Sequence, residues 1–158
     1  MEGLEGIKVE DMLKLENQLC FSLYVTSKEI VNAYRPYLEP LDLTYTQYIV
    51  MMALWEYKDM AVKELGHLLM LDSGTLTPLL KKLEAKGYLS RKRSKKDERV
   101  VMVILTAEGK ALRERAMTVP QELTKSVKGF SVEDVRELKR LLRKLQVAMG
   151  VLQPEEEK

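Results

Sequence analysis

The sequence predicts a mainly α-helical protein with one small β-hairpin wing, arranged as a winged helix-turn-helix with additional helices at both ends. Three observations predict this fold class. Three helical patterns in the middle of the chain are followed by a strand, a charged loop and a second strand. Residues suited to helix capping stand just before several of the helical patterns. Apolar stripes continue on the flanking helices, which predicts that those helices bury a face against a partner.

The bulk composition is that of a folded protein. The chain has 158 residues, of which 46% are hydrophobic and 32% are charged, so we expect one domain spanning 1–158. The N-terminal stretch MEGLEGIKVEDM is acidic and lacks a long apolar run, so no signal peptide is expected. No segment approaches the roughly 20 apolar residues of a membrane span. The single cysteine cannot form a disulfide within the chain, which indicates a reducing, cytoplasmic setting.

The first three helices are predicted from apolar spacing and caps. Residues 12–35 place Leu19, Leu23, Ile30 and Tyr34 on one face, and Pro36 is expected to end this helix. A second helix is expected to start at Thr44, which with Gln47 has the spacing of a capping box. Its run YIVMMALWEY is apolar on nearly all sides, so it should lie in the core. A short third helix is expected over 61–69.

The fourth helix is predicted over 73–87, with Gly87 as its stop. Its inner face is expected to consist of four leucines: Leu76, Leu79, Leu80 and Leu83. Pro78 leaves two starting points open. The helix either begins with Asp72 or Ser73 as its cap and is kinked at Pro78, or it begins with Thr77 as the cap and Pro78 in the first helical position.

A hairpin and two further helices complete the chain. Residues 88–93 and 100–105 read as strands, and the charged tip SKKDER between them is longer than a tight turn requires. Thr106 is expected to cap a helix over 106–127, which Pro120 should bend or break. Ser131 and Asp134 should start the last helix, which carries an apolar stripe up to Met149. The tail QPEEEK is expected to fray.

Basic charge is concentrated in one segment of an otherwise balanced chain. The formal net charge is only +2. Between Lys81 and Arg99 there are nine basic residues against three acidic ones, so this segment carries +6 and the rest of the chain −4. Such a distribution gives the protein one positive face, although a merely solvated helix and hairpin would show it too.

The fourth helix and the hairpin have the shape and the side chains of a DNA-reading unit. An α-helix fits the major groove of about 12 Å, and a narrow basic hairpin can reach the adjacent minor groove. The candidate contacts are Ser73, Thr75, Thr77, Lys81 and Lys82 on the helix, with Arg91 and Arg93 on the hairpin. An amphipathic helix that merely lies beside a hairpin is the plain alternative. The order of the elements, taken together with the charge, favours double-stranded DNA as the partner.

The flanking helices predict a homodimer. The winged unit occupies 44–105, and this small unit cannot cover the apolar stripes of the helices at 12–35 and 106–150. A second copy of the chain would bury them. A two-fold dimer would also present two recognition helices to DNA half-sites about 34 Å apart.

Four stretches within residues 12–150 carry a family resemblance: LENQLCFSLY, LTYTQYIVMMALWE, LDSGTLTPLLKKLEAKGYLSRKRS and DERVVMVILT. Through these stretches the chain resembles the MarR family of regulators and, within it, the organic hydroperoxide resistance repressors (OhrR). The resemblance implies a homodimeric repressor that binds a pseudo-palindromic operator and is released when its cysteine is oxidised by an organic hydroperoxide. It also implies that Asp97 orients Arg99 into the minor groove, and that the recognition helix begins near Asp72. Lys82 stands where some relatives have arginine.

Cys20 is the candidate redox sensor. The thiolate is the reactive form of cysteine, and hydrogen bonds to the charged form favour it. No Lys, Arg or His lies within a helical turn of Cys20 on its own face, whereas six of the seven tyrosines lie between Tyr24 and Tyr57. Phenols can donate such bonds while the pocket stays apolar, which suits an organic peroxide. The resemblance implies that Tyr34 and Tyr45 reach the thiol across the dimer interface, with Tyr24 close by.

Other functions stay open beside this interpretation. A helical cysteine is more often a small core residue, and the protein would then be a MarR-type regulator released by a small aromatic ligand. A thiol peroxidase would need a reductant, and an architectural protein would ignore the operator sequence. No catalytic triad, phosphate loop, dinucleotide motif or metal-ligand cluster is present in the sequence, so we expect neither an enzyme nor a cofactor. With one cysteine, a sulfenic acid would pass to a small thiol, a sulfenamide or a higher oxide.

Overall fold

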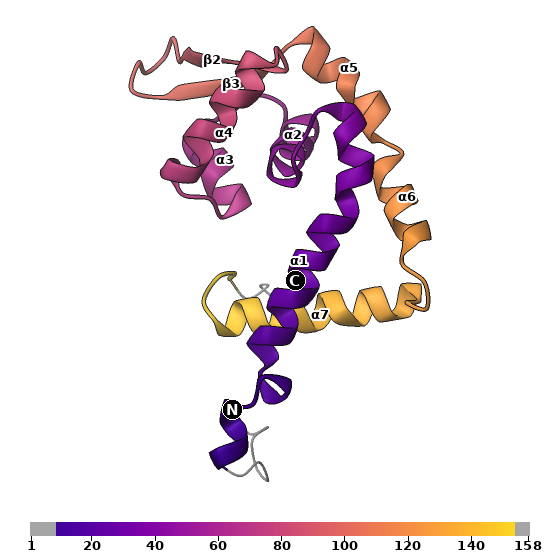
Figure 1. Ribbon diagram of the computed structural model, residues 1–158. Helices are drawn as coiled ribbons and strands as arrows, with labels where there is room; N and C mark the ends of the chain where they lie inside the picture. Colours follow the sequence, from indigo (N-terminus) through magenta and orange to yellow (C-terminus); the bar gives the residue numbers. More distant parts are fainter. Residues whose placement is uncertain (1–8, 154–158) are drawn as a thin grey trace. The chain divides into compact units, whose positions relative to one another are not determined.

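Figure 1 shows the computed structural model of the chain, which describes residues 9–153. Its mainly helical fold with one small antiparallel sheet confirms the predicted class. The first residues of the acidic N-terminal stretch and most of the tail expected to fray lie outside the described residues. The elements are η2 (Val9–Leu13), η3 (Leu15–Asn17), α1 (Leu19–Leu38), η4 (Glu39–Leu41), α2 (Tyr45–Tyr57), β1 (Met60–Ala61), α3 (Val62–Leu69), α4 (Ser73–Ala85), β2 (Leu89–Arg93), β3 (Val101–Leu105), α5 (Ala107–Ala116), α6 (Val119–Ser126) and α7 (Val132–Ala148).

The first helix differs from the prediction at both ends. Two short 3₁₀ helices precede α1, which starts at Leu19 and not near residue 12. The backbone is extended at Gln18, whose side-chain amide donates back to the carbonyl of Met12. Pro36 does not end the helix but lies in its last turn, where the N–H of Glu39 still donates to the carbonyl of Arg35. Burial of Leu38, which is 1% exposed, holds that last turn against the core.

The second helix confirms the prediction in detail. Thr44 and Gln47 form the reciprocal capping box, with Gln47 Oε1 accepting from the Thr44 N–H at 3.0 Å. Helix α2 is central to the core, since Val50, Met51 and Leu54 are fully buried. Its apolar character on all sides follows from this position.

The fourth helix starts from Asp72, as the resemblance implied. The Asp72 carboxylate accepts the N–H of Thr75 at 2.9 Å, so the alternative with Thr77 as the cap is wrong. Pro78 therefore lies inside α4, where it lacks the N–H of a helical hydrogen bond. The four predicted inner leucines are all buried and offset this loss. Past the end of the helix, Gly87 has φ +76°, the left-handed conformation that glycine adopts most readily.

The hairpin is part of a three-stranded sheet in the order β1-β3-β2. Strands β2 and β3 pair antiparallel from Leu89 opposite Leu105 to Arg93 opposite Val101. Both strands start within a residue of their predicted bounds and end at them. Strand β1 was not predicted, because two residues are too short to show a periodicity. It joins the segment before α3 to the wing through the pairing of Met60 with Val103.

The helix predicted over 106–127 is two helices. Thr106 caps α5 by accepting the N–H of Gly109 at 3.0 Å, as expected. The break falls between α5 and α6, and Pro120 stands in the first turn of α6, where a proline is tolerated. Gly109 packs tightly against the residue that precedes β2, since an added Cβ would lie 1.9 Å from the carbonyl oxygen of Tyr88. Its own carbonyl accepts the indole N–H of Trp55 at 2.8 Å.

Contacts divide the chain into one compact unit up to Leu123 and a second from Thr124, so a single domain spanning 1–158 stays a prediction. In the second unit Ser131 and Asp134 form the predicted capping box of α7. None of the residues of α7 is buried within the chain. Among residues 9–153, no helix is long and apolar enough to cross a membrane.

Candidate functional site

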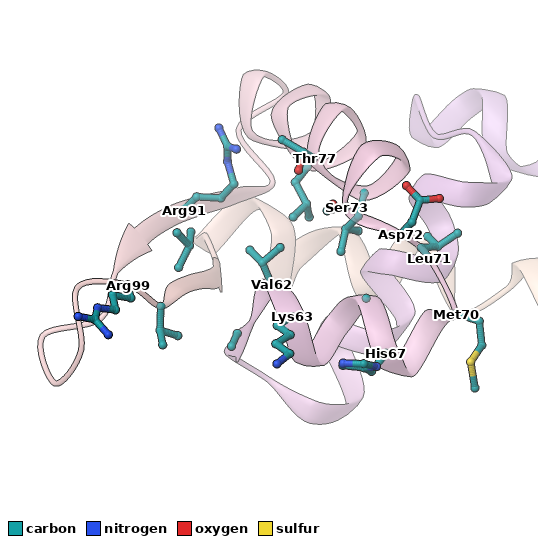
Figure 2. Close-up of a pocket in the computed structure, with 16 residues that line it drawn as sticks. Val62, Lys63, His67, Met70, Leu71, Asp72, Ser73, Thr77, Arg91 and Arg99 are labelled. Atoms are coloured by element: carbon teal, nitrogen blue, oxygen red, sulfur yellow. The ribbon is translucent and has the colours of Figure 1, made fainter. Parts of the chain in front are cut away.

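A groove of about 690 Å³ runs between the helix-turn-helix and the base of the wing, and is called the helix–wing groove below. Figure 2 shows the labelled side chains that line it from α3, α4 and the hairpin. Its cationic groups are Lys63 on α3 together with Arg91 and Arg99 on the hairpin. Leu76, Leu80 and Val101 contribute apolar lining. A positively charged groove beside an exposed helix can hold a phosphate backbone.

The polar side chains on the outer face of α4 differ in whether they are already hydrogen-bonded within the chain. Ser73 and Thr77 line the groove, and Lys81 and Lys82 are exposed on the same helix. The hydroxyl of Thr75 is engaged, because it donates to Asp72 Oδ2 at 3.1 Å. The hydrogen bonds from the backbone and side chain of Thr75 lower the pKa of Asp72 from its ordinary value.

Arg91 is fastened to the fourth helix. Its Nε and one terminal nitrogen donate to Glu84 Oε2 at 3.0 and 2.7 Å, and its backbone N–H donates to Glu84 Oε1 at 2.8 Å. These bonds lower the pKa of Glu84. Both side chains are partly shielded, with 25% of Arg91 and 34% of Glu84 exposed. The pair therefore ties the first strand of the wing to the recognition helix.

The wing tip is ordered by Asp97. Its carboxylate accepts the backbone N–H of Arg99 at 2.9 Å, and its carbonyl accepts the N–H of Val100 at 3.0 Å. Arg93 donates from its guanidinium to the carbonyl of Glu98 at 2.8 Å, so it too serves the loop. The Arg99 side chain is exposed and lines the groove. Asp97 thus positions the backbone of the residue that the sequence singled out.

Two groove residues were missed by the sequence reasoning. Lys63 and His67 stand one turn apart on α3 and face the same groove as Arg99. His67, the one histidine of the sequence, is exposed. The signal that could have found them is their i, i+4 spacing on the polar face of the helix before the turn.

Cys20 lies in the first turn of α1 and is exposed. Because α1 begins later than predicted, the thiol sits near a helix N-terminus, where unpaired N–H groups favour negative charge. Tyr24, one turn further on, is 62% exposed. The environment within one chain is therefore open on the side that Cys20 and Tyr24 share.

Tyr34 and Tyr45 form a pair elsewhere in the same unit. Their ring centroids lie 5.0 Å apart, and Tyr48 is 6.0 Å from Tyr34. Burial, followed by the neighbouring Tyr45, raises the pKa of Tyr34, so its phenol stays protonated and able to donate. Cys20 and Tyr34 are 14 residues apart on one helix, which separates them by about 21 Å along its axis. The pair cannot reach the thiol of its own chain.

Each compact unit carries an apolar face that nothing in that unit covers. On α1, exposed side chains include Leu19 at 63% and Ile30 at 44%. On α7 they include Val132, Val135, Leu138 and Leu141. Exposed apolar area of this kind marks an interaction surface.

Among residues 9–153, no group of His, Cys, Asp and Glu side chains could hold a metal ion.

The sequence matches the transcriptional regulator SarA/Rot family over residues 32–116. It is 47% identical over 132 residues to the organic hydroperoxide resistance transcriptional regulator of Bacillus subtilis, covering 84% of this chain and 89% of that protein.

The fold is similar to two regulators solved with DNA. Reduced AbfR bound to DNA, a Staphylococcus epidermidis protein, has a TM-score of 0.74 and 30% identity, covering 90% of this chain and 99% of that one. Overoxidised AbfR bound to DNA has a TM-score of 0.69 and 33% identity, covering 87% and 99%. A mutant of MarR from E. coli complexed with operator DNA has a TM-score of 0.72 and 27% identity, covering 88% and 99%.

Proposed function

Because the chain belongs to the MarR family of transcriptional regulators, we propose that it is a peroxide-sensing repressor in which Cys20 controls operator binding. In this proposal a homodimer binds a pseudo-palindromic operator in the cytoplasm and leaves it when an organic hydroperoxide oxidises the thiol. The observation that carries the proposal is the exposed Cys20 in the first turn of an α1 whose apolar face is uncovered within its unit.

The dimer supplies what one chain lacks. Pairing of two α1 helices would bury the exposed apolar side chains and bring the phenol pair of one subunit to the thiol of the other. Tyr34 and Tyr45 of the partner subunit would then donate hydrogen bonds to the Cys20 thiolate, with Tyr24 of the same chain beside it. The separation of about 21 Å along α1 within one chain makes contact across the interface the available route.

The chemical step is a two-electron oxidation. The thiolate attacks the terminal oxygen of the hydroperoxide and the O–O bond breaks, so that the sulfur keeps the hydroxyl as a sulfenic acid. The alkoxide that leaves takes a proton from water and departs as the alcohol. The sulfur of the sulfenic acid carries no negative charge, so the hydrogen bonds that the phenols of Tyr34 and Tyr45 donate to it become weaker. A second arrangement of these tyrosines and of the chain around them is then favoured.

On the DNA side, the helix–wing groove provides the contacts. Ser73, Thr77, Lys81 and Lys82 of α4 face the major groove, and Arg99 of the wing reaches the minor groove with its backbone fixed by Asp97. Thr75 acts mainly within the helix cap, and Arg91 and Arg93 mainly hold the wing in place. Lys63 adds a phosphate contact from α3.

Gel-shift titration of the reduced protein with operator DNA, before and after treatment with cumene hydroperoxide, tests the proposal. We expect tight binding before oxidation and release after it. Dithiothreitol should restore binding where the oxidised species is a sulfenic acid, a sulfenamide or a mixed disulfide, and not where it is a higher oxide. Light scattering should report a dimer, and the intact mass of the treated protein identifies the oxidised species. A protein that stays bound although its mass shows complete oxidation would contradict the proposal.

A second pocket favours an alternative function, in which a small ligand controls DNA binding. A pocket of about 440 Å³ beside Tyr45 includes Val31 and Leu43 in its lining and has room for a small aromatic ligand. Its charged lining is balanced, with Arg35 and Lys86 against Glu39 and Asp42. Under this alternative such a ligand releases the DNA and Cys20 is only structural. Release by an aromatic acid that persists in a Cys20→Ser variant would favour it.

A Glu84→Gln variant is expected to lose discrimination between operator and random duplex by roughly fivefold, within the cost of one imperfect base contact. The substitution loosens the wing from α4, because Arg91 loses its charged partner. Removal of a negative charge near DNA should at the same time strengthen binding to random duplex. Anisotropy titrations with both DNAs measure the two effects.

Glu98→Gln is the matched control, because it removes an exposed negative charge from the wing and leaves the Glu84–Arg91 pair intact. It should strengthen binding to both DNAs about equally. Equal discrimination by the two variants would show that the tie between wing and helix does not position the reading head.

A further inference from the structure

The turn between α1 and α2 presents three consecutive backbone carbonyls to side chains from three other parts of the chain, and we call this arrangement the carbonyl clamp. A guanidinium from α5, a phenol from the start of the hairpin and an ammonium from the end of α4 each hold one carbonyl. The pairs are Arg115 with Pro40 at 2.6 Å, Tyr88 with Leu41 at 3.3 Å, and Lys86 with Asp42.

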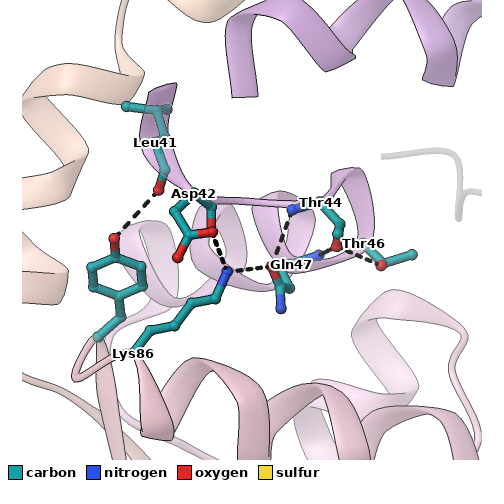
Figure 3. A network of polar contacts seen from close by, with 7 residues as sticks. Leu41, Asp42, Thr44, Thr46, Gln47 and Lys86 are labelled. Carbon is teal, nitrogen blue, oxygen red and sulfur yellow. Dashed lines mark hydrogen bonds and ion pairs between the residues drawn. The ribbon is translucent and has the colours of Figure 1, made fainter. Parts of the chain in front are cut away.

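Lys86 forms the central contact of the clamp (Figure 3). Its ammonium also lies 3.0 Å from Asp42 Oδ1 and donates to Gln47 Oε1 at 3.4 Å. The same Gln47 oxygen caps α2 by accepting the N–H of Thr44. Lys86 is the C-cap residue of the recognition helix α4, and its side chain is only 26% exposed. One side chain thus joins the end of α4 to the first turn of α2.

The clamped turn lies between the two phenols of the proposed sensor. Tyr34 is on the helix that runs into the turn, and Tyr45 is the first residue of the helix that leaves it. Asp42 within the turn has φ +53°, a left-handed conformation that aspartate tolerates better than most residues. A movement of either phenol therefore acts on a short turn whose carbonyls accept hydrogen bonds from other parts of the chain.

We infer that Lys86 and Tyr88 are positioning residues that couple the Tyr34–Tyr45 pair to the recognition helix and the wing. This inference rests on the proposed function, because it needs the pair to respond to the state of Cys20. Directional bonds to three carbonyls fix the orientation of the turn, which apolar packing alone would leave softer. When the pair moves, the turn carries Lys86 and Tyr88 with it, and α4 and β2 move relative to the DNA.

A purely structural role predicts a different outcome. Loss of a structural contact would weaken the folded protein and lower operator affinity in both redox states alike. Loss of a coupling contact leaves the reduced protein competent and lowers the ratio of its affinity to that of the oxidised protein. Lys86 is absent from the lining of the helix–wing groove, so its removal takes no direct contact from that groove.

The test measures operator Kd by fluorescence anisotropy for wild type, Lys86→Met, Lys86→Arg and Tyr88→Phe. Each protein is studied reduced and after cumene hydroperoxide, with complete oxidation checked by intact mass. We expect Lys86→Met and Tyr88→Phe to lower the oxidised-to-reduced Kd ratio by about tenfold, a typical coupling between sites. Lys86→Arg should keep the wild-type ratio, because it retains a charged donor.

Lys82→Met is the charge-matched control, since it removes a positive charge from the exposed face of the same helix. It should weaken DNA binding in both states and leave the ratio unchanged. Tyr88→Phe removes one oxygen only, so it decides the matter if Lys86→Met does not fold. Wild-type ratios in both Lys86→Met and Tyr88→Phe would overturn the inference while the proposed function stands. Wild type that stays bound when fully oxidised would overturn both.

Discussion

A Cys20→Ser variant is expected to bind the operator as tightly as wild type and to remain bound after treatment with an organic hydroperoxide. Serine has nearly the shape of cysteine, and Cys20 lies on α1, outside the lining of the helix–wing groove. The hydroxyl cannot form a sulfenic acid, so the oxidised state is never reached. We expect peroxide to weaken wild-type binding by at least about 100-fold, equivalent to about 2.8 kcal/mol, and binding of the variant by less than twofold.

The measurement is an anisotropy titration of one labelled operator with both proteins, each before and after cumene hydroperoxide. Wild type that is oxidised in the presence of a small thiol and then reduced with dithiothreitol is the control, and its affinity should return because the mixed disulfide is reducible. A Cys20→Ser protein that still leaves the DNA on peroxide treatment would place the sensor elsewhere. Release by an aromatic acid and not by peroxide would instead favour the pocket beside Tyr45.

The local chemistry of the sequence predicted several helix starts correctly. The capping pairs Thr44–Gln47 and Ser131–Asp134, and the cap Thr106, are all formed as expected. A cap depends on residues only three positions apart, so one sequence contains the whole interaction. The two strands of the hairpin were predicted from short strand-like runs on either side of a charged tip, the second of them rich in β-branched residues.

Tertiary contacts decided the features that the sequence did not predict. Pro36 was expected to end its helix and Pro78 left two helix starts open, yet both prolines lie inside helices, where buried leucines beside them hold the turns in place. The late start of α1 depends on Gln18, whose amide bonds to a carbonyl six residues back. That start bears on the chemistry, since it places Cys20 near a helix N-terminus and not in the middle of a helix.

For the candidate site, the sequence predicted which residue types would be present. It did not predict which contacts those residues make within the protein. The basic stripe indicated a DNA-reading face, and Arg99 does line the groove. The sequence does not show that Arg91 is held by Glu84, because the pair forms only when the hairpin folds back onto α4. The carbonyl clamp is still less visible, since a backbone acceptor such as that of Leu41 has no signature of its own. The dimer contacts of Cys20, Tyr24, Tyr34 and Tyr45 stay predictions.

An Arg99→Ala variant is expected to lose operator affinity by about 10- to 100-fold and random-duplex affinity by much less. The guanidinium projects from an ordered wing tip, since Asp97 holds the backbone N–H of Arg99. An arginine placed in the minor groove responds to groove width and thereby to sequence, and its loss typically costs about 1–3 kcal/mol. Anisotropy titrations of both DNAs from about 50 to 200 mM salt separate this contribution from simple charge attraction.

Lys95→Ala, on the same loop, is the control that distinguishes loss of a positive charge from loss of sequence reading. Lys95 is exposed at the wing tip and outside the groove lining, so we expect it to act as a charge alone. Its removal should weaken operator and random duplex equally and reduce the log–log salt slope by about 0.9, the value for one released counterion. If Arg99→Ala showed the same uniform loss, Arg99 would be a phosphate contact and the wing would carry no sequence preference. A larger loss on the operator would instead mean that Asp97 holds Arg99 where it can read the shape of the minor groove.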